Sequence, residues 1–290
     1  MKRVVSCFLI VLLLFGLNVS ATSLIDVKGT SYEKAVSLLE KLGVVSGYED
    51  GSFGVDRAVT RAEFAAMVAR LMNLSDVSGS NPFSDVPSNH WAAADIAALT
   101  DRGVITGVSE SEFAPEENVS FEQAIKMLTI ATGYEPYALQ NGGYPIGYMV
   151  AAATAGITKG ISAQAGEITR GTVAKLLYNT ATVSILEVVG VGETIRYSAE
   201  SGETLLSRYH DIYSEEGILN ANYRVGIGTE KARVGYVKLD GQAYQIVDDE
   251  ARINDLLGYH VEIFYRSQLG NDERQIVYVD VPDGKNEVLT

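Results

Sequence analysis

The sequence predicts a chain of two parts, an all-α part made of repeated helix-loop-helix units and a small all-β domain that follows it. The first part is predicted by a repeat, because residues 26–74 and 85–133 carry the same pattern of glycines, aromatic residues and helix starts. The second part is predicted by a change in the apolar period, which shifts to two beyond Gly190–Gly202. A repeat on this scale indicates one supersecondary unit that is copied and packed against its neighbours.

Five positions define the repeat at a constant spacing of 60 residues. Gly43, Gly47, Phe53, Thr60 and Glu63 recur as Gly103, Gly107, Phe113, Ser120 and Gln123. A third, degraded copy keeps the order with a loop that is four residues shorter, and it contains Gly156, Gly160, Thr169 and Arg170. A site that forms between two such units is therefore expected to recur along the chain.

Each copy is predicted to form two helices around a turn-rich loop. The spacing of a capping box, which opens a helix, occurs at Thr30 with Glu33, at Thr60 with Glu63 and at Ser120 with Gln123. Gly43 is placed to end the first helix as a C-terminal glycine. Thr169 opens the last helix without a reciprocal glutamate.

The second part is predicted to contain five short strands. They are expected near Gly217–Ile227, Ala232–Leu239, Ala243–Val247, Tyr259–Arg266 and Gln275–Val281. Asp240-Gly241 is a hairpin signal between two of them, and Ile253–Leu257 is predicted as a short helix between the third and fourth strands. Five strands with a helix in that place predict an OB-like barrel, and an open sandwich is the alternative.

Residues 1–21 have the pattern of a secretory signal peptide. Lys2 and Arg3 precede the apolar stretch Val4–Leu17, and Val19-Ser20-Ala21 supplies the small residues of a cleavage site after Ala21. A retained membrane anchor is the alternative. The single cysteine, Cys7, lies in this segment, so the mature chain would be secreted without disulfides, which favours a Gram-positive surface.

The formal net charge of the chain is −14, and both parts are acidic. A nucleic-acid partner is therefore not expected. An anionic ligand would need local donors, because the overall field repels it. No segment after the signal peptide is apolar for long enough to span a membrane.

Four short motifs make the repeat specific. They are Phe83-Ser84-Asp85-Val86 with Trp91, Gly103-Val104-Ile105-Thr106-Gly107, Tyr48-Glu49-Asp50-Gly51-Ser52-Phe53, and Thr60-Arg61-Ala62-Glu63 with Phe64. With these motifs the chain resembles the S-layer homology domain, the cell-wall anchoring module of bacterial surface proteins. The resemblance covers about 160 residues. It implies a pseudo-threefold assembly of three repeats around a helical bundle. The expected segments are a signal peptide (1–21), repeats at 22–78, 79–137 and 138–185, the last degenerate, and a β domain at 186–290.

The resemblance also implies a location and a function. The protein is expected in the cell wall or S-layer, where it anchors a secreted surface protein to a secondary cell-wall polysaccharide, often one capped with a pyruvate ketal. Other surface-layer proteins are a second candidate partner, and no cofactor or metal is expected. Two alternatives remain: a wall-associated hydrolase or transport-linked protein that uses the repeats only as an anchor, and a self-assembling surface-layer subunit.

Arg61 and Arg170 are the predicted clamps for a ketal carboxylate. Each follows a helix cap, so its side chain is expected to point away from the core, where a guanidinium can hold a carboxylate in two places. Thr60 caps the start of the helix that Arg61 begins, and the Glu63 side chain is expected to bond in return to the Thr60 N–H. The free N–H groups and the dipole at this end would attract an anion. A capping box without any ligand is the alternative for this pair.

Aromatic residues are predicted to pack on the apolar face of the sugar. Trp91 is the first candidate, and a wedge between two repeats is its alternative role. Tyr32 lies six residues after Asp26, as Trp91 lies six after Asp85. Tyr144 lies 12 residues before Gly156, as Trp91 lies 12 before Gly103, so the two tyrosines are expected in the tryptophan position.

The resemblance implies that Gly47 and Gly107 line the groove and that Asp26 and Asp85 contribute to it. The residues themselves allow other interpretations. The glycines are placed as turn residues that need positive φ, and the aspartates as caps at helix starts.

The copies also depart from the pattern. Phe121 stands where arginine is expected, and Gly171-Thr172 replaces the last two residues of the motif in the third copy. One or two competent grooves are therefore expected rather than three. No catalytic residue is assigned, because the three histidines are scattered and the acidic run Asp248-Asp249-Glu250 is typical of a solvated turn.

Overall fold

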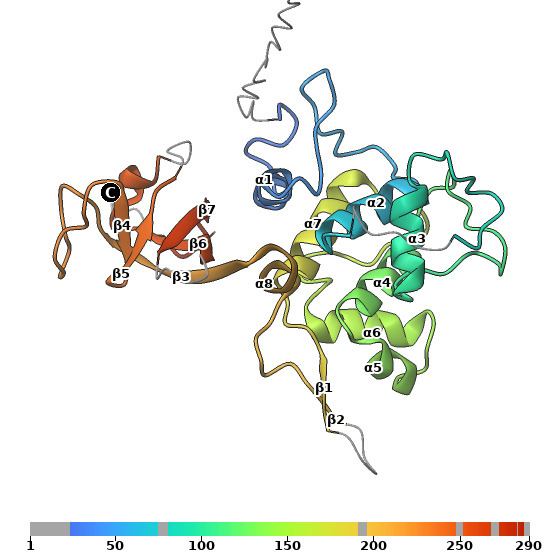
Figure 1. Ribbon diagram of the computed structural model, residues 1–290. Coiled ribbons are helices and arrows are strands. Elements are labelled where there is room, and N and C mark those ends of the chain that lie inside the picture. The colour runs from blue at the N-terminus through green and yellow to red at the C-terminus, as the bar shows by residue number, and fades with distance from the viewer. Residues whose placement is uncertain are drawn as a thin grey trace, which may run out of the picture.

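The computed structural model describes residues 24–74, 81–190, 196–247, 252–267, 273–282 and 284–286. The predicted signal peptide and the acidic run at 248–250 lie outside these ranges. A helical part is followed by a β part, so the chain has the predicted mixture of a helical and a β region (Figure 1). None of the described helices is long and apolar enough to cross a bilayer.

Three helix pairs make up the helical part. The first pair is α1 (Glu33–Lys41) and α2 (Arg61–Leu71), and the second is α3 (Ala93–Asp101) and α4 (Phe121–Ala131). The third pair is α6 (Ile146–Ala155) and α7 (Arg170–Thr182), preceded by the short helix α5 (Glu135–Gln140). We call these pairs, with the loops inside them and the stretch of chain that leads into each pair, the first, second and third helical segments. Their apolar faces share one core, in which Phe53, Phe64, Phe113 and Phe121 are fully buried.

Side-chain caps fix where the second helix of each segment begins. Thr60 with Glu63 and Ser120 with Gln123 form two of the three predicted capping boxes, and Thr169 accepts from the Thr172 backbone N–H without the reciprocal bond of a capping box. The box predicted at Thr30 and Glu33 is wrong. Helix α1 begins at Glu33, two residues later than that box predicts, because Thr30 donates to the Val27 carbonyl and the Glu33 carboxylate accepts from the Gly29 N–H instead.

Backbone bridges join the capped helix starts in a closed ring. Thr60 pairs with Asn118, Ser120 with Glu167, and Ala58 with Thr169. The ring also uses the first helical N–H groups. Those of Arg61, Phe121 and Arg170 donate to Glu117, Gly166 and Arg57 over 2.8, 2.9 and 2.8 Å. Each segment therefore contacts the next in the same way, and the third returns to the first.

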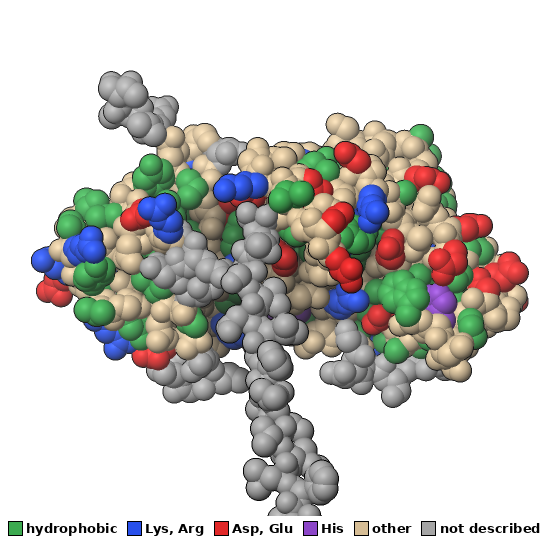
Figure 2. Space-filling model, turned by 90° about the horizontal axis from the view of Figure 1, so that it is seen from above, with side chains coloured by type: hydrophobic (Ala, Val, Ile, Leu, Met, Phe, Trp, Pro, Cys, Tyr) green, Lys and Arg blue, Asp and Glu red, His purple; other side chains and the backbone are tan. Residues whose placement is uncertain are grey.

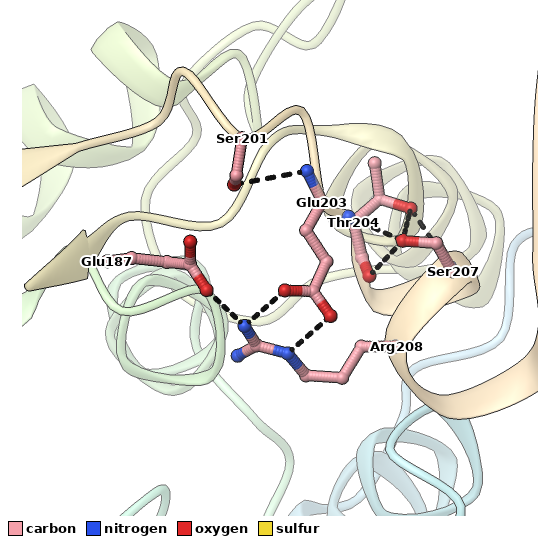
Figure 3. A network of polar contacts seen from close by, with 6 residues as sticks. All are labelled: Glu187, Ser201, Glu203, Thr204, Ser207 and Arg208. Carbon is pink, nitrogen blue, oxygen red and sulfur yellow. Dashed lines mark hydrogen bonds and ion pairs between the residues drawn. The ribbon is translucent and has the colours of Figure 1, made fainter. Parts of the chain in front are cut away.

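A hairpin and a short helix connect the helical part to the barrel, at the start of the stretch that the sequence assigned to the β domain without predicting either element. Strands β1 (Glu187–Gly190) and β2 (Arg196–Ser198) pair, and α8 (Leu205–His210) follows. The Arg208 guanidinium lies between two carboxylates, 2.6 Å from Glu187 and 2.7 Å from Glu203 (Figure 3). This ion-pair network ties the first strand of the hairpin to the helix.

The β part is a closed barrel. Its strands are β3 (Ile212–Ala221), β4 (Tyr236–Leu239), β5 (Gln242–Gln245), β6 (His260–Ser267) and β7 (Arg274–Asp280), with the 3₁₀ helix η2 (Ile253–Leu256) between β5 and β6. The order around the barrel is β3-β4-β5-β7-β6, with β5 and β7 parallel and the other pairs antiparallel. The predicted hairpin turn at Asp240-Gly241 is present, with positive φ at both residues. The sheet closes, so the open-sandwich alternative is wrong.

The barrel packs against the helical part through α1 and α7. The Lys34 ammonium lies 2.8 Å from both Glu262 and Asp280 of the barrel. Burial opposes this charge, but the two carboxylates and Tyr178 together raise the pKa of Lys34 above its usual value. Phe264 of β6 meets the Tyr178 ring of α7 edge to face at 6.4 Å. These contacts hold the two parts in one arrangement.

Candidate binding site between the helical segments

Arg61 crosses from the first helical segment to the second. Its Nε donates to the Phe113 carbonyl over 2.8 Å and its Nη2 to the Thr106 carbonyl over 3.4 Å, and the guanidinium lies 4.6 Å from the Phe113 ring centre. The residue is 2% exposed. The expectation that it points away from the protein interior is therefore wrong, because the neighbouring segment covers this helix end.

Arg170 repeats this geometry between the third and the first segment. Its Nε donates to the Phe53 carbonyl over 3.0 Å and its Nη2 to the Ser46 carbonyl over 2.8 Å. The guanidinium lies 4.6 Å from the Phe53 ring centre. Phe53 and Ser46 are the counterparts of Phe113 and Thr106 at the 60-residue spacing. The two arginines therefore occupy equivalent positions in the ring of segments.

Burial lowers the pKa of both guanidinium groups, whereas nearby oxygens oppose this effect. Glu117, Asp85 and Tyr144 raise the pKa of Arg61, and Tyr48 and Glu63 raise that of Arg170. An arginine side chain does not lose its proton in proteins, so both groups remain cationic at neutral pH.

A cavity of about 170 Å³ lies beside Arg61, and all three segments contribute to it. Arg61 comes from the first segment, Lys126 and Gly107 from the second, and Tyr144 from the loop before α6 of the third; the other residues of the lining are Val104, Thr106, Val108, Gln123 and Met127. Lys126 Nζ is 3.3 Å from Thr106 Oγ1 and 5.7 Å from the Tyr144 ring centre. The cavity combines two cations with an exposed aromatic ring.

Sequence reasoning missed Lys126. A signal for it was present, because a lysine stands six residues after the cap in two copies, as Lys126 after Ser120 and as Lys175 after Thr169. The first copy has Ala66 at this position. In the structure Lys175 lies 4.6 Å from the Tyr32 ring centre, as Lys126 lies near Tyr144. The two predicted tyrosines thus occupy equivalent positions, each against a lysine of the preceding segment around the ring.

Trp91 differs from both tyrosines. It is 58% exposed and stacks on the His90 ring at 5.7 Å, so it is not a wedge between two segments. The aromatic rings beside the Arg170 guanidinium are Phe53 and Tyr48, and Tyr48 is 5.2 Å away. The sequence did not single out Tyr48 as a site residue.

Gly47 and Gly107 are required for space and not for positive φ, which corrects the prediction. A Cβ on Gly107 would lie 2.3 Å from the Ser109 carbonyl oxygen and 2.4 Å from that of Glu112. A Cβ on Gly47 would lie 2.3 Å from a methyl group of Leu24. The backbone therefore approaches itself closely beside the Arg61 clamp, whereas beside the Arg170 clamp the space at Gly47 is filled mainly by the Leu24 side chain.

Asp26 and Asp85 hold the turns that the arginines contact. The Asp26 carboxylate accepts from the N–H groups of Phe53, Gly54 and Val55 over 2.7 to 3.1 Å. Asp85 accepts from the equivalent Phe113 and Ala114. Neither aspartate caps a helix, so that alternative is wrong. Burial favours a higher pKa for Asp26, but the backbone N–H donors lower it below its usual value.

Thr60 and Glu63 form a reciprocal cap, and the helix end they close is not free for an anion. The Glu63 carboxylate accepts from the Thr60 N–H over 2.9 Å, and Thr60 Oγ1 accepts from the Glu63 N–H over 3.2 Å. The N–H groups of Arg61 and Ala62 donate to carbonyls of the second segment. The prediction of free N–H groups at this end is therefore wrong, and the charge available to a ligand comes from side chains.

The interface between the second and third segments has a different character. Phe121 replaces the arginine and lines an apolar pocket with Pro145, Ile146, Met149 and Val150.

In the part of the chain that the structure describes, no group of three or more His, Cys, Asp or Glu side chains could hold a metal ion. On the face drawn in Figure 2, acidic side chains gather at the helical end on the right, so an anion there depends on local cations.

Comparison with known proteins identifies the repeated unit. Residues 26–65 and 82–125 each match the S-layer homology domain. The chain carries S-layer homology domains. The two matches coincide with the first two helical segments, up to the early part of α2 and α4. Both Asp26 and Asp85 and the capped helix starts lie within them.

Three relatives are surface proteins of bacteria. A "Middle cell wall protein" of Brevibacillus brevis is 30% identical over 87% of this chain and 26% of its own length. A "Surface layer protein" of Brevibacillus choshinensis is 32% identical over 61% of this chain and 16% of its own length. A "Cell surface protein" of Thermoanaerobacter kivui is 29% identical over 99% of this chain and 36% of its own length. The predicted location, secreted and in the cell wall or S-layer, is confirmed by the domain matches together with these relatives.

Proposed function

We propose that this chain anchors a surface protein non-covalently to a secondary cell-wall polysaccharide that carries pyruvate ketals. The observation that carries the proposal is the cavity in which three helical segments place Arg61, Lys126 and Tyr144 together. The anchoring role is non-catalytic and needs no cofactor. The barrel serves as a spacer or as a second interaction module.

A pyruvate ketal fits the chemistry of this cavity. It adds one carboxylate to a compact sugar ring, and a carboxylate pairs with a guanidinium more strongly than a neutral group does. The bonds to Phe113 and Thr106 use two of the five N–H donors of Arg61, so donors remain for a ligand. Lys126 adds a second positive charge, and the exposed Tyr144 ring offers a flat face to the apolar side of the sugar.

The three interfaces of the ring differ in how well they suit such a ligand. The interface at Arg61 has two cations. The one at Arg170 has Ala66 in the lysine position and Glu63 within electrostatic reach of the arginine. The third has Phe121 in the arginine position. We infer that the groove at Arg61 binds most tightly and that the groove at Arg170 contributes weakly. Joint binding of both grooves to one polymer strengthens attachment.

The ring of backbone bridges supports an assembly of three S-layer homology repeats, at 22–78, 79–137 and 138–185, although the last is too divergent to match the family. An OB-like fold for the barrel is supported by the parallel closing pair β5–β7 and by η2 between the third and fourth strands. Other surface-layer proteins remain a second candidate partner of this assembly.

Co-sedimentation of the full chain with purified cell walls tests the proposed groove. Lys126→Gln keeps the size and polarity of the side chain and removes one charge from the cavity. Loss of one charge-assisted hydrogen bond should weaken retention about tenfold. Lys126 is preferred to Arg61 for this test because Arg61 also holds the Phe113 turn.

Lys175→Gln is the matched control. Lys175 has the same position after a helix cap and also lies near a tyrosine ring, but its interface has Phe121 in the arginine position. This variant should be retained like the unaltered chain. If both variants bind walls as the unaltered chain does, the proposed groove is not the binding site.

A further inference from the structure

We infer that the end of the barrel at which Tyr213 and Tyr265 lie carries a second glycan-binding site, which takes a neutral sugar unit. That the sugar belongs to the wall polysaccharide depends on the proposed function. The site is formed by Tyr213 and Glu215 of β3, Tyr265 of β6 and Arg274 of β7, with the Tyr244 hydroxyl of β5 beneath them. These residues have no role in the groove between the helical segments.

The alternation of side chains along the strands places this cluster at the end of the barrel. Tyr213 and Glu215 belong to the same face of β3 as the buried Leu219, and Tyr265 to the same face of β6 as the buried Ile263. Tyr213 and Tyr265 are paired across the two strands. The inward-facing rows thus continue beyond the packed barrel core and end in polar and aromatic groups. Mouths of β-barrels are common places for ligand sites.

The Tyr213 ring is the exposed aromatic face of the cluster, and the Tyr265 ring lies partly buried beside it. Tyr213 is 43% exposed, and its ring lies 5.9 Å from that of Tyr265 with 31° between the planes. Tyr265 is held from below by Tyr244, edge to face at 5.2 Å. A supported, partly exposed tyrosine suits the apolar face of a pyranose, whose C–H bonds are attracted by the negative face of the ring.

A hydrogen-bonded arginine–carboxylate pair lies beside these rings. The Arg274 guanidinium donates to the Glu215 carboxylate over 2.9 Å and to the Tyr244 hydroxyl over 3.0 Å, and the Tyr244 hydroxyl donates to the same carboxylate. The guanidinium is also 5.1 Å from the Tyr265 ring centre. A fixed guanidinium and a fixed carboxylate offer donors and acceptors side by side, the arrangement that neighbouring sugar hydroxyls require.

The charge balance of the cluster selects a neutral sugar. Arg274 is already paired with Glu215, so a carboxylate ligand would have to compete with Glu215 and would be repelled by it. The groove at Arg61 has the opposite balance, with two cations around an open cavity. The two sites should therefore recognise different parts of one polymer, its anionic cap and its neutral chain.

Titration calorimetry of the full chain with wall polysaccharide freed of its pyruvate ketals by mild acid tests this inference. The unaltered chain should bind this polymer, and Tyr213→Ala should weaken binding at least fivefold. Tyr213→Phe should keep it within twofold, because the ring remains. Tyr259→Ala is the matched control, since Tyr259 is 37% exposed at the other end of β6, and it should bind like the unaltered chain.

The inference is overturned if the unaltered chain does not bind the ketal-free polymer, or if Tyr213→Ala binds it equally well. A different result is expected if the groove at Arg61 and Lys126 does not bind the pyruvate ketals. In that case removal of the ketals would leave the affinity of the unaltered chain unchanged, while Tyr213→Ala would still weaken it.

Discussion

Arg61 and Arg170 each stabilise a turn of the neighbouring segment and also supply positive charge at the interface. Hydrogen bonds from charged groups contribute about 1.5–3 kcal/mol each, so removal of either arginine should destabilise the fold as well as the site. The sequence predicted both arginines as site residues. It did not predict their burial, because the covering turn belongs to another copy of the repeat.

For other residues too, roles that depend on partners close in sequence were predictable and roles that depend on distant partners were not. The reciprocal caps at Thr60 and Ser120 were predictable, since all partners lie within four residues. The roles of Asp26 and Asp85 were not, because their partners lie 27 to 29 residues away in sequence. Lys126 was missed because the first copy lacks it, and comparison of the second and third copies alone would have revealed it.

Gly107→Ala tests the role of close backbone approach beside Arg61. The added Cβ would meet two carbonyl oxygens of the turn, and we expect a loss of about 1–3 kcal/mol in the free energy of unfolding. Because the displaced turn includes the acceptors of Arg61, wall binding should also fall. Urea unfolding and wall co-sedimentation measure the two effects.

Gly103→Ala provides the comparison. Gly103 has φ of +66°, so alanine there is strained, but nothing lies within 4 Å of the new Cβ. This variant should lose stability and keep its wall binding. A Gly107→Ala protein that is as stable as the unaltered chain would contradict the steric account.

At the scale of elements, the helices and strands with a clear apolar period were predictable. All five barrel strands overlap their predicted positions, and η2 lies within the predicted short helix. The β1–β2 hairpin and α8 were not foreseen. Strands of four and three residues and a helix of six are too short for a period to stand out. They are stabilised by contacts with other elements, such as the Arg208 ion pairs.

The end of α8 contains a group whose protonation should affect stability. His210 Nε2 lies 2.9 Å from the Leu71 carbonyl at the end of α2, and a carbonyl oxygen can only accept, so Nε2 donates. Burial lowers the pKa of His210, an effect that Arg266 reinforces and the bond to Leu71 opposes. The folded state therefore takes up a proton less readily than the unfolded state.

We expect the stability of the protein to fall as the pH decreases below about 6.5, the ordinary pKa of histidine. The contribution of His210 is present above that value and is lost below it, because protonation then favours the unfolded chain. His210→Gln keeps a donor but does not titrate, so its stability should fall less. Urea unfolding at pH 7.5 and 5.5 measures this, and equal losses in the two proteins would contradict it.

At the scale of the whole molecule, the closed ring of three segments is what makes a composite groove possible. The repeat was visible in the sequence, but the order in which copies meet was not. Arg61 acts on the turn of the following copy, and the cavity then takes Tyr144 from the copy after that. The placement of the barrel against α1 and α7 was equally hidden, because Lys34 and Glu262 are 228 residues apart.

The same arrangement explains why the copies are unequal. Each interface takes its arginine position from one segment and its lysine position from the next, and at two interfaces the third segment adds a tyrosine, Tyr144 or Tyr32. A substitution in one copy, such as Phe121 or Ala66, therefore alters a single interface. We expect one principal groove, one weaker groove and one interface that packs without binding.

The most direct measurement of the central claim is the affinity of the full chain for wall polysaccharide with and without its pyruvate ketals, by titration calorimetry at one salt concentration. Removal of the ketals should weaken binding at least tenfold, the equivalent of one charge-assisted contact of about 1.4 kcal/mol. Residual binding would come from the barrel. Equal affinity for the two polymers would contradict the claim that Arg61 and Lys126 hold the anionic cap of the polymer.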